Sequence, residues 1–176
     1  MRVFLSRHDK NRYDDRMPVI TLKELKDHLP KGKRLMGIDQ SKKALGLALS
    51  NPDLTIATPL CTIRRTKFTQ DVKELAAVCR EYGVGGFVIG LPLNMDGSEG
   101  PRVDSVRHFA DNLMQAQDVL GFDPLIAFFD ERLSTSAVED MLDEHSRLSR
   151  EERNKVIDKL AAQVILQGAL ESLARN

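Results

Sequence analysis

Four carboxylates stand at positions where they could do chemistry. Asp39 ends a short apolar run that begins at Leu35, and Asp130 and Glu131 end a second apolar run. Asp158 lies in the last strongly apolar stretch of the chain, at the border of its expected inner face. Acids at strand ends are also common turn residues, so the spacing by itself leaves a structural role open.

If these acids converge in the fold, a metal ion is the expected reason. Two carboxylates about 4 Å apart repel by about 4 kcal/mol at an effective dielectric of about 20. A divalent cation offsets this charge, and ligation by oxygen alone favours Mg²⁺ or Mn²⁺. One or two such ions would activate water and stabilise the transition state of phosphodiester hydrolysis. Cys61 and Cys79 lack a zinc-site spacing, so neither a zinc site nor a disulfide framework is expected.

A long loop is the second candidate element of a site. It spans residues 91–101 and joins an apolar run to a predicted helix. Its eleven residues exceed the usual two to six of such a connection, and loops of that length are usually functional or disordered. Backbone amides at its glycines, together with the start of the following helix, suit a phosphate group.

The elements that must position these residues follow from the hydrophobic pattern. Strands are predicted at residues 35–39, 44–50, 56–63, 86–90 and 124–129, and helices at residues 68–82, 102–120, 134–145 and 150–174. The last helix is expected to turn inward Ile157, Leu160, Ala161, Val164 and Gly168. This order predicts an α/β fold with a mixed five-stranded sheet, a three-strand antiparallel meander plus two parallel strands, flanked by helices.

Composition and charge limit the remaining possibilities. The 176 residues are 41% apolar and carry 26 basic against 26 acidic side chains, which argues against a strongly basic protein that coats nucleic acid. Residues 1–34 hold ten Lys or Arg against five acids, and we expect them to form a basic extension ahead of a domain at 35–176. A capping box of Thr21 and Glu24 predicts one short helix in the extension.

The sequence shows no feature of a membrane or secreted protein. No apolar run approaches the length of about 18 residues that a membrane span needs. The N-terminus has neither a signal-peptide nor a transit-peptide pattern. A cytoplasmic protein without membrane contact is therefore expected.

Four segments together resemble the YqgF family of RNase H-like nucleases. They are Gly37-Ile38-Asp39 through Lys43 and Gly46, the loop from Gly90-Leu91-Pro92 to Glu99-Gly100, Asp130-Glu131-Arg132-Leu133-Ser134-Thr135, and Asp158-Lys159-Leu160-Ala161-Ala162 with Ile165-Leu166. The resemblance covers about residues 35–172 in order. The family is related to the Holliday-junction resolvase RuvC and is associated with pre-16S rRNA, so the resemblance implies an RNase H-like fold.

The resemblance also implies roles for individual residues. The metal-binding and catalytic acids would be Asp39, Glu131 and Asp158. The residues near the scissile phosphate would be Asn94, Arg132 and Thr135. Asp130 is the residue most easily confused with a ligand, because adjacent strand positions point to opposite faces and only one of the pair is expected to enter the site.

Two positions depart from the first motif of the family. Ser41 stands where many members have Gly, and Ala44 stands where many have Arg. Without the Gly, backbone approaches a phosphate less closely, and without the Arg a bidentate phosphate donor is lost. Lys42 and Lys43 remain as substrate-binding point charges. Because the acids are intact, we expect a working metal site with altered binding of the substrate.

The expected function is that of a Mg²⁺- or Mn²⁺-dependent nuclease acting on structured RNA, with 5′-end processing of pre-16S rRNA as the reaction that the family implies. One alternative is a resolvase of four-way DNA junctions, which needs two active sites related by a two-fold axis. Another is a non-catalytic nucleic-acid-binding factor in ribosome assembly or transcription. An ATPase of the sugar-kinase or actin type would need two domains, and this chain has one. We expect a monomer or a weak homodimer.

Overall fold

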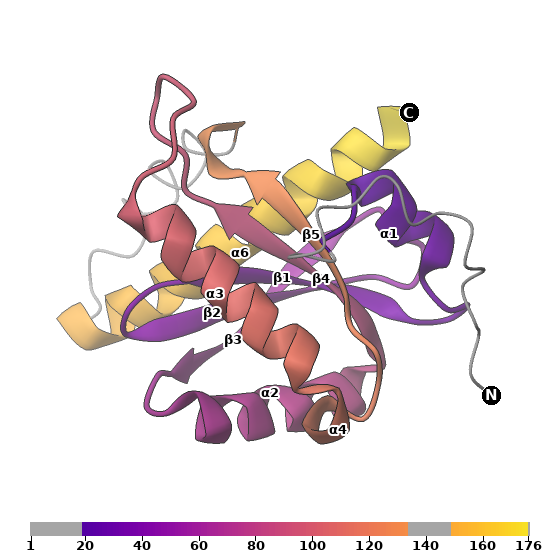
Figure 1. Ribbon diagram of the computed structural model, residues 1–176, viewed down its shortest axis with the longest axis horizontal. Helices are drawn as coiled ribbons and strands as arrows, with labels where there is room; N and C mark the ends of the chain where they lie inside the picture. Colours follow the sequence, from indigo (N-terminus) through magenta and orange to yellow (C-terminus); the bar gives the residue numbers. More distant parts are fainter. Residues whose placement is uncertain (1–18, 134–148, 176) are drawn as a thin grey trace.

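A twisted five-stranded sheet lies between two layers of helices (Figure 1). The structure is a computed structural model that describes residues 19–133 and 149–175. The strands are β1 (Arg34–Gln40), β2 (Ala44–Ser50), β3 (Ala57–Arg64), β4 (Val84–Leu91) and β5 (Leu125–Asp130). Their order in the sheet is β3-β2-β1-β4-β5. The first three pair antiparallel, and β4 and β5 continue the sheet in parallel, so the predicted mixed sheet and RNase H-like fold are confirmed.

The helices cover the sheet on both faces (Figure 1). They are α1 (Leu22–His28), α2 (Phe68–Tyr82), α3 (Pro101–Gln115), α4 (Gln117–Leu120) and α6 (Arg150–Arg175), and the 3₁₀ turn η1 (Glu131–Leu133) follows β5. Alternate residues of β1 pack against the helices on opposite faces of the sheet, because successive side chains of a strand point to opposite faces. Met36 and Ile38 pack with α2 and α3, whereas Leu35 packs with α1 and α6. Asp39, the next-to-last residue of β1, therefore lies on the α6 side.

One predicted helix is wrong in its extent. The helix expected over residues 102–120 is broken at Ala116, which ends α3 and precedes α4. The break lets the short α4 turn Leu120 into the core, and Gly121 then ends α4 in a left-handed conformation. The helix expected over 134–145 lies outside the described residues.

The predicted inner face of α6 is also wrong. The side chains that α6 buries are Ala162, Ile165, Leu166, Ala169, Leu170 and Leu173. This face is rotated by about one residue from the predicted one. Between residues 156 and 170 apolar side chains lie on both the predicted and the observed face, so the sequence pattern alone does not choose between them.

The helix predicted in the basic extension is present and packs against the sheet. Thr21 and Glu24 form the expected capping box at the start of α1. Leu25 is fully buried, and just before the helix Val19 bridges to Ile126 in parallel at the free edge of β5. Residues 19–28 therefore cover an edge that would otherwise expose unpaired backbone groups. No helix among the described residues has the length and apolar character needed to cross a membrane.

Candidate active site

Asp39 and Asp158 come together because α6 lies directly on β2. Asp39 is paired with Gly46 across the β1–β2 ladder. A Cβ atom added at Gly46 would overlap the backbone carbonyl group of Asp158, so only glycine lets the helix come so close to the sheet here. The helix thus delivers Asp158 beside the end of β1.

Glu131 reaches the same edge from β5. Ile38 pairs in parallel with Ile89, so the next residues, Asp39 and Gly90, lie beside each other near the carboxyl ends of β1 and β4. A Cβ atom at Gly90 would lie 2.5 Å from Oε1 of Glu131, which means that the Glu131 side chain lies over this glycine. Three acids that are distant in sequence therefore share one edge, which we call the carboxylate edge (Asp39, Glu131 and Asp158).

The carboxylate edge is electrostatically unfavourable in the absence of a cation. Burial, followed by the charges of Glu131 and Asp158, raises the pKa of Asp39 to about 7. Burial also raises the pKa values of Glu131 and Asp158 above their ordinary values. The three groups therefore resist ionisation, and a bound cation would relieve this.

Asp130 has a different environment from its neighbour Glu131. Both of its carboxylate oxygens accept hydrogen bonds from the Arg132 guanidinium, the shortest from Nη2 at 2.6 Å, and its Oδ1 also accepts from the Arg132 backbone amide. These bonds hold the pKa of Asp130 below its ordinary value. Asp130 is therefore an orienting partner of Arg132.

The loop predicted to contact phosphate is closed by its own hydrogen bonds. The Asn94 backbone amide donates to the Ser98 carbonyl at 2.9 Å, and Asn94 Nδ2 donates to Ser98 Oγ at 2.9 Å. Arg132 Nη1 donates to the carbonyl oxygen of Met95 at 3.3 Å, which joins the loop to η1. Asn94 and Arg132 both line an open hollow of about 400 Å³ that also includes Glu131.

Arg102 is a residue of the site that the sequence analysis missed. It lines the same hollow, and its charge lowers the pKa values of Asp39 and Glu131 against the raising effect of burial. It lies in the first turn of α3, where the helix dipole disfavours a cation. A basic residue at that unfavourable position is the signal that the sequence offered.

The remaining predicted substrate-binding residues lie beside this edge or outside the described residues. Lys42 and Lys43 are exposed in the β1–β2 loop, where they follow Ser41. Ser41 shapes the loop, because its Oγ accepts hydrogen bonds from the backbone amides of Lys43 and Ala44. Thr135 lies outside the described residues.

Comparison with known proteins places the chain in a family. The model of the family described as "RuvX: Holliday junction resolvase" matches residues 33–172. The chain belongs to the RuvX family. The resemblance to YqgF proteins is thereby confirmed, since the two names denote one family.

Curated members of the RuvX family are similar over nearly their whole length. A protein of Rhodospirillum centenum named "Putative pre-16S rRNA nuclease" is 54% identical over 91% of this chain and 85% of its own. One of the same name from Paramagnetospirillum magneticum is 53% identical over 89% of this chain and 97% of its own. Among solved structures, T. thermophilus RuvC in complex with a Holliday junction substrate matches with a TM-score of 0.45 and 11% identity, over 80% of this chain and 96% of that one.

Proposed function

We propose that this RuvX protein is a divalent-metal-dependent nuclease that hydrolyses phosphodiester bonds of structured RNA, at the 5′ end of a pre-16S rRNA. The observation that carries the proposal is the carboxylate edge, where three acids from three elements lie together and burial raises the pKa of each. The names of the curated relatives support the RNA substrate. Such a substrate would place the protein in the cytoplasm.

The donors of the carboxylate edge fit a hard divalent cation in type and charge. They offer oxygen only, which suits Mg²⁺ or Mn²⁺. Within residues 19–133 and 149–175, no three Asp, Glu, His or Cys side chains are close enough to form a ready-made metal cage. The proposal therefore rests on chemical type and burial, with Asp39, Glu131 and Asp158 as the ligands.

A bound cation would supply an activated water and charge stabilisation for phosphodiester hydrolysis. The residues around it would orient the substrate. Arg132, held by Asp130, and Asn94 would contact the phosphate from the loop side, and the family resemblance adds Thr135 to these contacts. Lys42 and Lys43 would contact it from the β1–β2 side. Arg102, whose charge lowers the pKa values of Asp39 and Glu131, would balance part of the negative charge at the carboxylate edge.

Resolution of four-way DNA junctions is the second candidate function, because the family model carries that description. The chemistry at the carboxylate edge would be the same. Two cuts related by symmetry would require two copies of the chain on one junction, and hence a homodimer in the complex. A chain that remains monomeric on its substrate would argue against this candidate.

The decisive experiment compares the wild-type chain with Asp39→Asn in Mg²⁺ or Mn²⁺. Both are incubated with a 5′-leader rRNA precursor fragment and, in parallel, with a four-way DNA junction. Asp27→Asn, an exposed acid on α1, is the matched control. We expect metal-dependent cleavage of the RNA by the wild type and by the control, and a loss of at least about 100-fold with Asp39→Asn.

Other outcomes would replace the proposal. Selective cleavage of the junction would establish the resolvase instead. Binding of RNA with no cleavage by the wild type in either metal would show a nucleic-acid-binding factor that retains the fold without turnover.

A further inference from the structure

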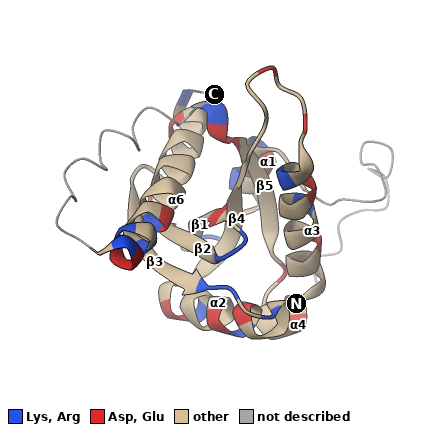
Figure 2. Ribbon diagram, turned by 90° about the vertical axis from the view of Figure 1, so that its left-hand side faces the viewer, with Lys and Arg blue, Asp and Glu red and all other residues tan. Residues whose placement is uncertain are grey.

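Four basic side chains lie next to the carboxylate edge, on two adjacent segments of the chain. Lys42 and Lys43 lie in the β1–β2 loop, and Arg64 and Lys67 lie between the end of β3 and the start of α2 (Figure 2). All four are exposed, and none of them forms an ion pair with any residue that the structure describes. We call these four residues the basic platform.

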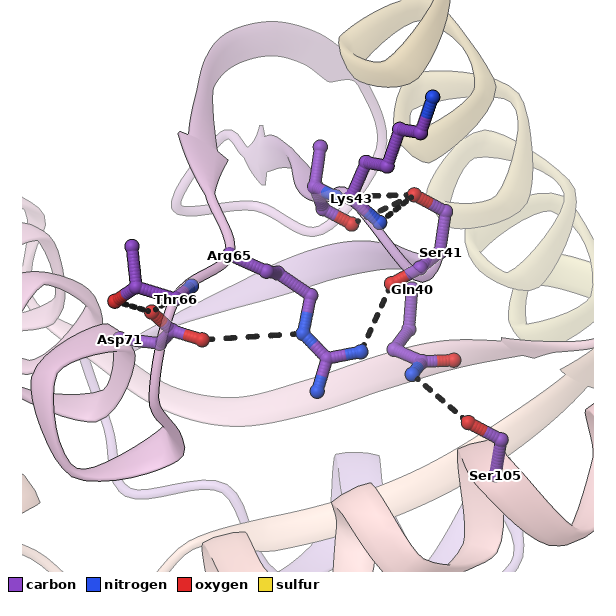
Figure 3. A network of polar contacts seen from close by, with 8 residues as sticks. Gln40, Ser41, Lys43, Arg65, Thr66, Asp71 and Ser105 are labelled. Atoms are coloured by element: carbon purple, nitrogen blue, oxygen red, sulfur yellow. Dashed lines mark hydrogen bonds and ion pairs between the residues drawn. The ribbon is translucent and has the colours of Figure 1, made fainter.

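The two segments of the basic platform are joined by hydrogen bonds. Ala44 pairs with Arg64 in the β2–β3 ladder. The backbone amide of Arg65 donates to the Lys43 carbonyl at 2.8 Å, and Arg65 Nη1 donates to the Ser41 carbonyl at 2.8 Å (Figure 3). One residue thus holds the β1–β2 loop at two places, and the platform behaves as a single surface.

Arg65 is itself held from inside the protein. Its Nε lies 3.8 Å from Oδ2 of Asp71, and its guanidinium lies 5.7 Å from the centre of the Phe109 ring. Asp71 is only 2% exposed, and its Oδ1 accepts hydrogen bonds from the backbone amide and hydroxyl of Thr66 (Figure 3). A buried ion pair adds little to net stability compared with apolar packing, so its value here lies in fixing a position.

We propose that the basic platform binds the phosphate backbone of the nucleic acid that enters the carboxylate edge, and that Arg65 is the positioning residue that keeps its loop in place. The proposal rests on the proposed nuclease function and extends its substrate contact beyond the scissile phosphate. Exposed Lys and Arg bind phosphates without regard to sequence. Because the chain has zero net charge, attraction of a polyanion must come from a local surface of this kind.

The experiment measures nucleic-acid affinity as a function of salt. The full chain carrying Asp39→Asn, which should bind without cutting, is titrated into a labelled RNA hairpin with a single-stranded 5′ leader at several NaCl concentrations. The platform variant replaces all four residues by Gln: Lys42→Gln, Lys43→Gln, Arg64→Gln and Lys67→Gln. The matched control removes the same charge from α1 and the turn after it: Lys23→Gln, Lys26→Gln, Lys31→Gln and Lys33→Gln.

The salt dependence separates phosphate contacts from other effects. Each phosphate contact contributes about 0.7 to 0.9 to the slope of log K against log salt. We expect the platform variant to lose about 3 to 3.5 units of slope and to bind at least about tenfold more weakly at low salt, whereas the control keeps its slope within about 0.5. An unchanged slope in a folded platform variant would overturn the platform while leaving the nuclease intact. Absence of any RNA binding by the Asp39→Asn chain would overturn both.

A conservative variant tests the positioning role. Arg65→Lys keeps the charge but cannot bond Ser41 and face Asp71 together, because Lys lacks the planar fork. In the active chain we expect a raised KM with an unchanged kcat, and in the binding assay a several-fold weaker affinity with an unchanged salt slope. Binding and KM equal to those of the wild type would show that Arg65 does not position the loop.

Discussion

At the scale of single residues, the raised pKa of Asp39 has a consequence for stability. In the unfolded chain this group titrates near 3.8, and in the folded chain near 7. The folded state therefore holds a proton more tightly, and stability falls as the pH rises from about 4 to about 7. Without metal, Asp39→Asn should stabilise the protein by about 1 to 3 kcal/mol above pH 7, and by progressively less towards pH 4.

Urea denaturation in EDTA at pH 8 and pH 5 measures this effect. The Asp27→Asn control should show no such pH-dependent gain, because Asp27 is exposed on α1. A wild-type chain that is at least as stable as Asp39→Asn at pH 8 would contradict the electrostatic cost of the carboxylate edge.

The acids of the candidate site were easier to predict from the sequence than the residues that surround them. Asp39 and Glu131 could be singled out because each follows an apolar strand. A contrast between Asp130 and Glu131 was expected, because adjacent strand positions point to opposite faces, but the Arg132 guanidinium that folds back onto Asp130 was not predictable from the sequence. Arg102 was missed because its proximity to Asp39 arises only when α3 and β1 are packed in one fold.

At the scale of elements, the approach of α6 to β2 depends on one missing side chain. Gly46→Ala would place a methyl group onto the Asp158 carbonyl group, and neither backbone can yield without moving the helix. We expect a loss of about 1 to 3 kcal/mol in unfolding free energy. We also expect cleavage to fall by at least about tenfold, because Asp158 moves away from Asp39.

Thermal denaturation and single-turnover cleavage on the same preparation test this prediction. A Gly46→Ala chain with wild-type stability and rate would mean that α6 does not need its close approach.

The strands that surround this contact were predictable because short apolar runs bounded by turns mark strands well. The inner face of α6 was not predictable, because apolar residues lie on both the predicted and the observed face of the helix between residues 156 and 170.

At the scale of the whole molecule, substitutions in α1 can show where the folded domain begins. The proposed division sets residues 1–34 apart as an extension, yet Leu25 is fully buried against the sheet. Leu25→Ala should cost about 2 to 5 kcal/mol of unfolding free energy. Lys26→Ala, exposed on the same helix, should cost almost nothing. Chemical denaturation of both variants measures the difference, and equal stabilities would leave the boundary at residue 34.

The path of α6 across the sheet has a further consequence for when the molecule can act. This helix contacts all five strands and carries Asp158, whereas Asp39 belongs to the first strand. The two acids meet only after contacts between distant parts of the sequence have formed, which are the slow steps of folding. A partly folded chain therefore has dispersed carboxylates and no assembled centre. On the proposed nuclease function, a chain that has not reached its native state would therefore cleave no RNA.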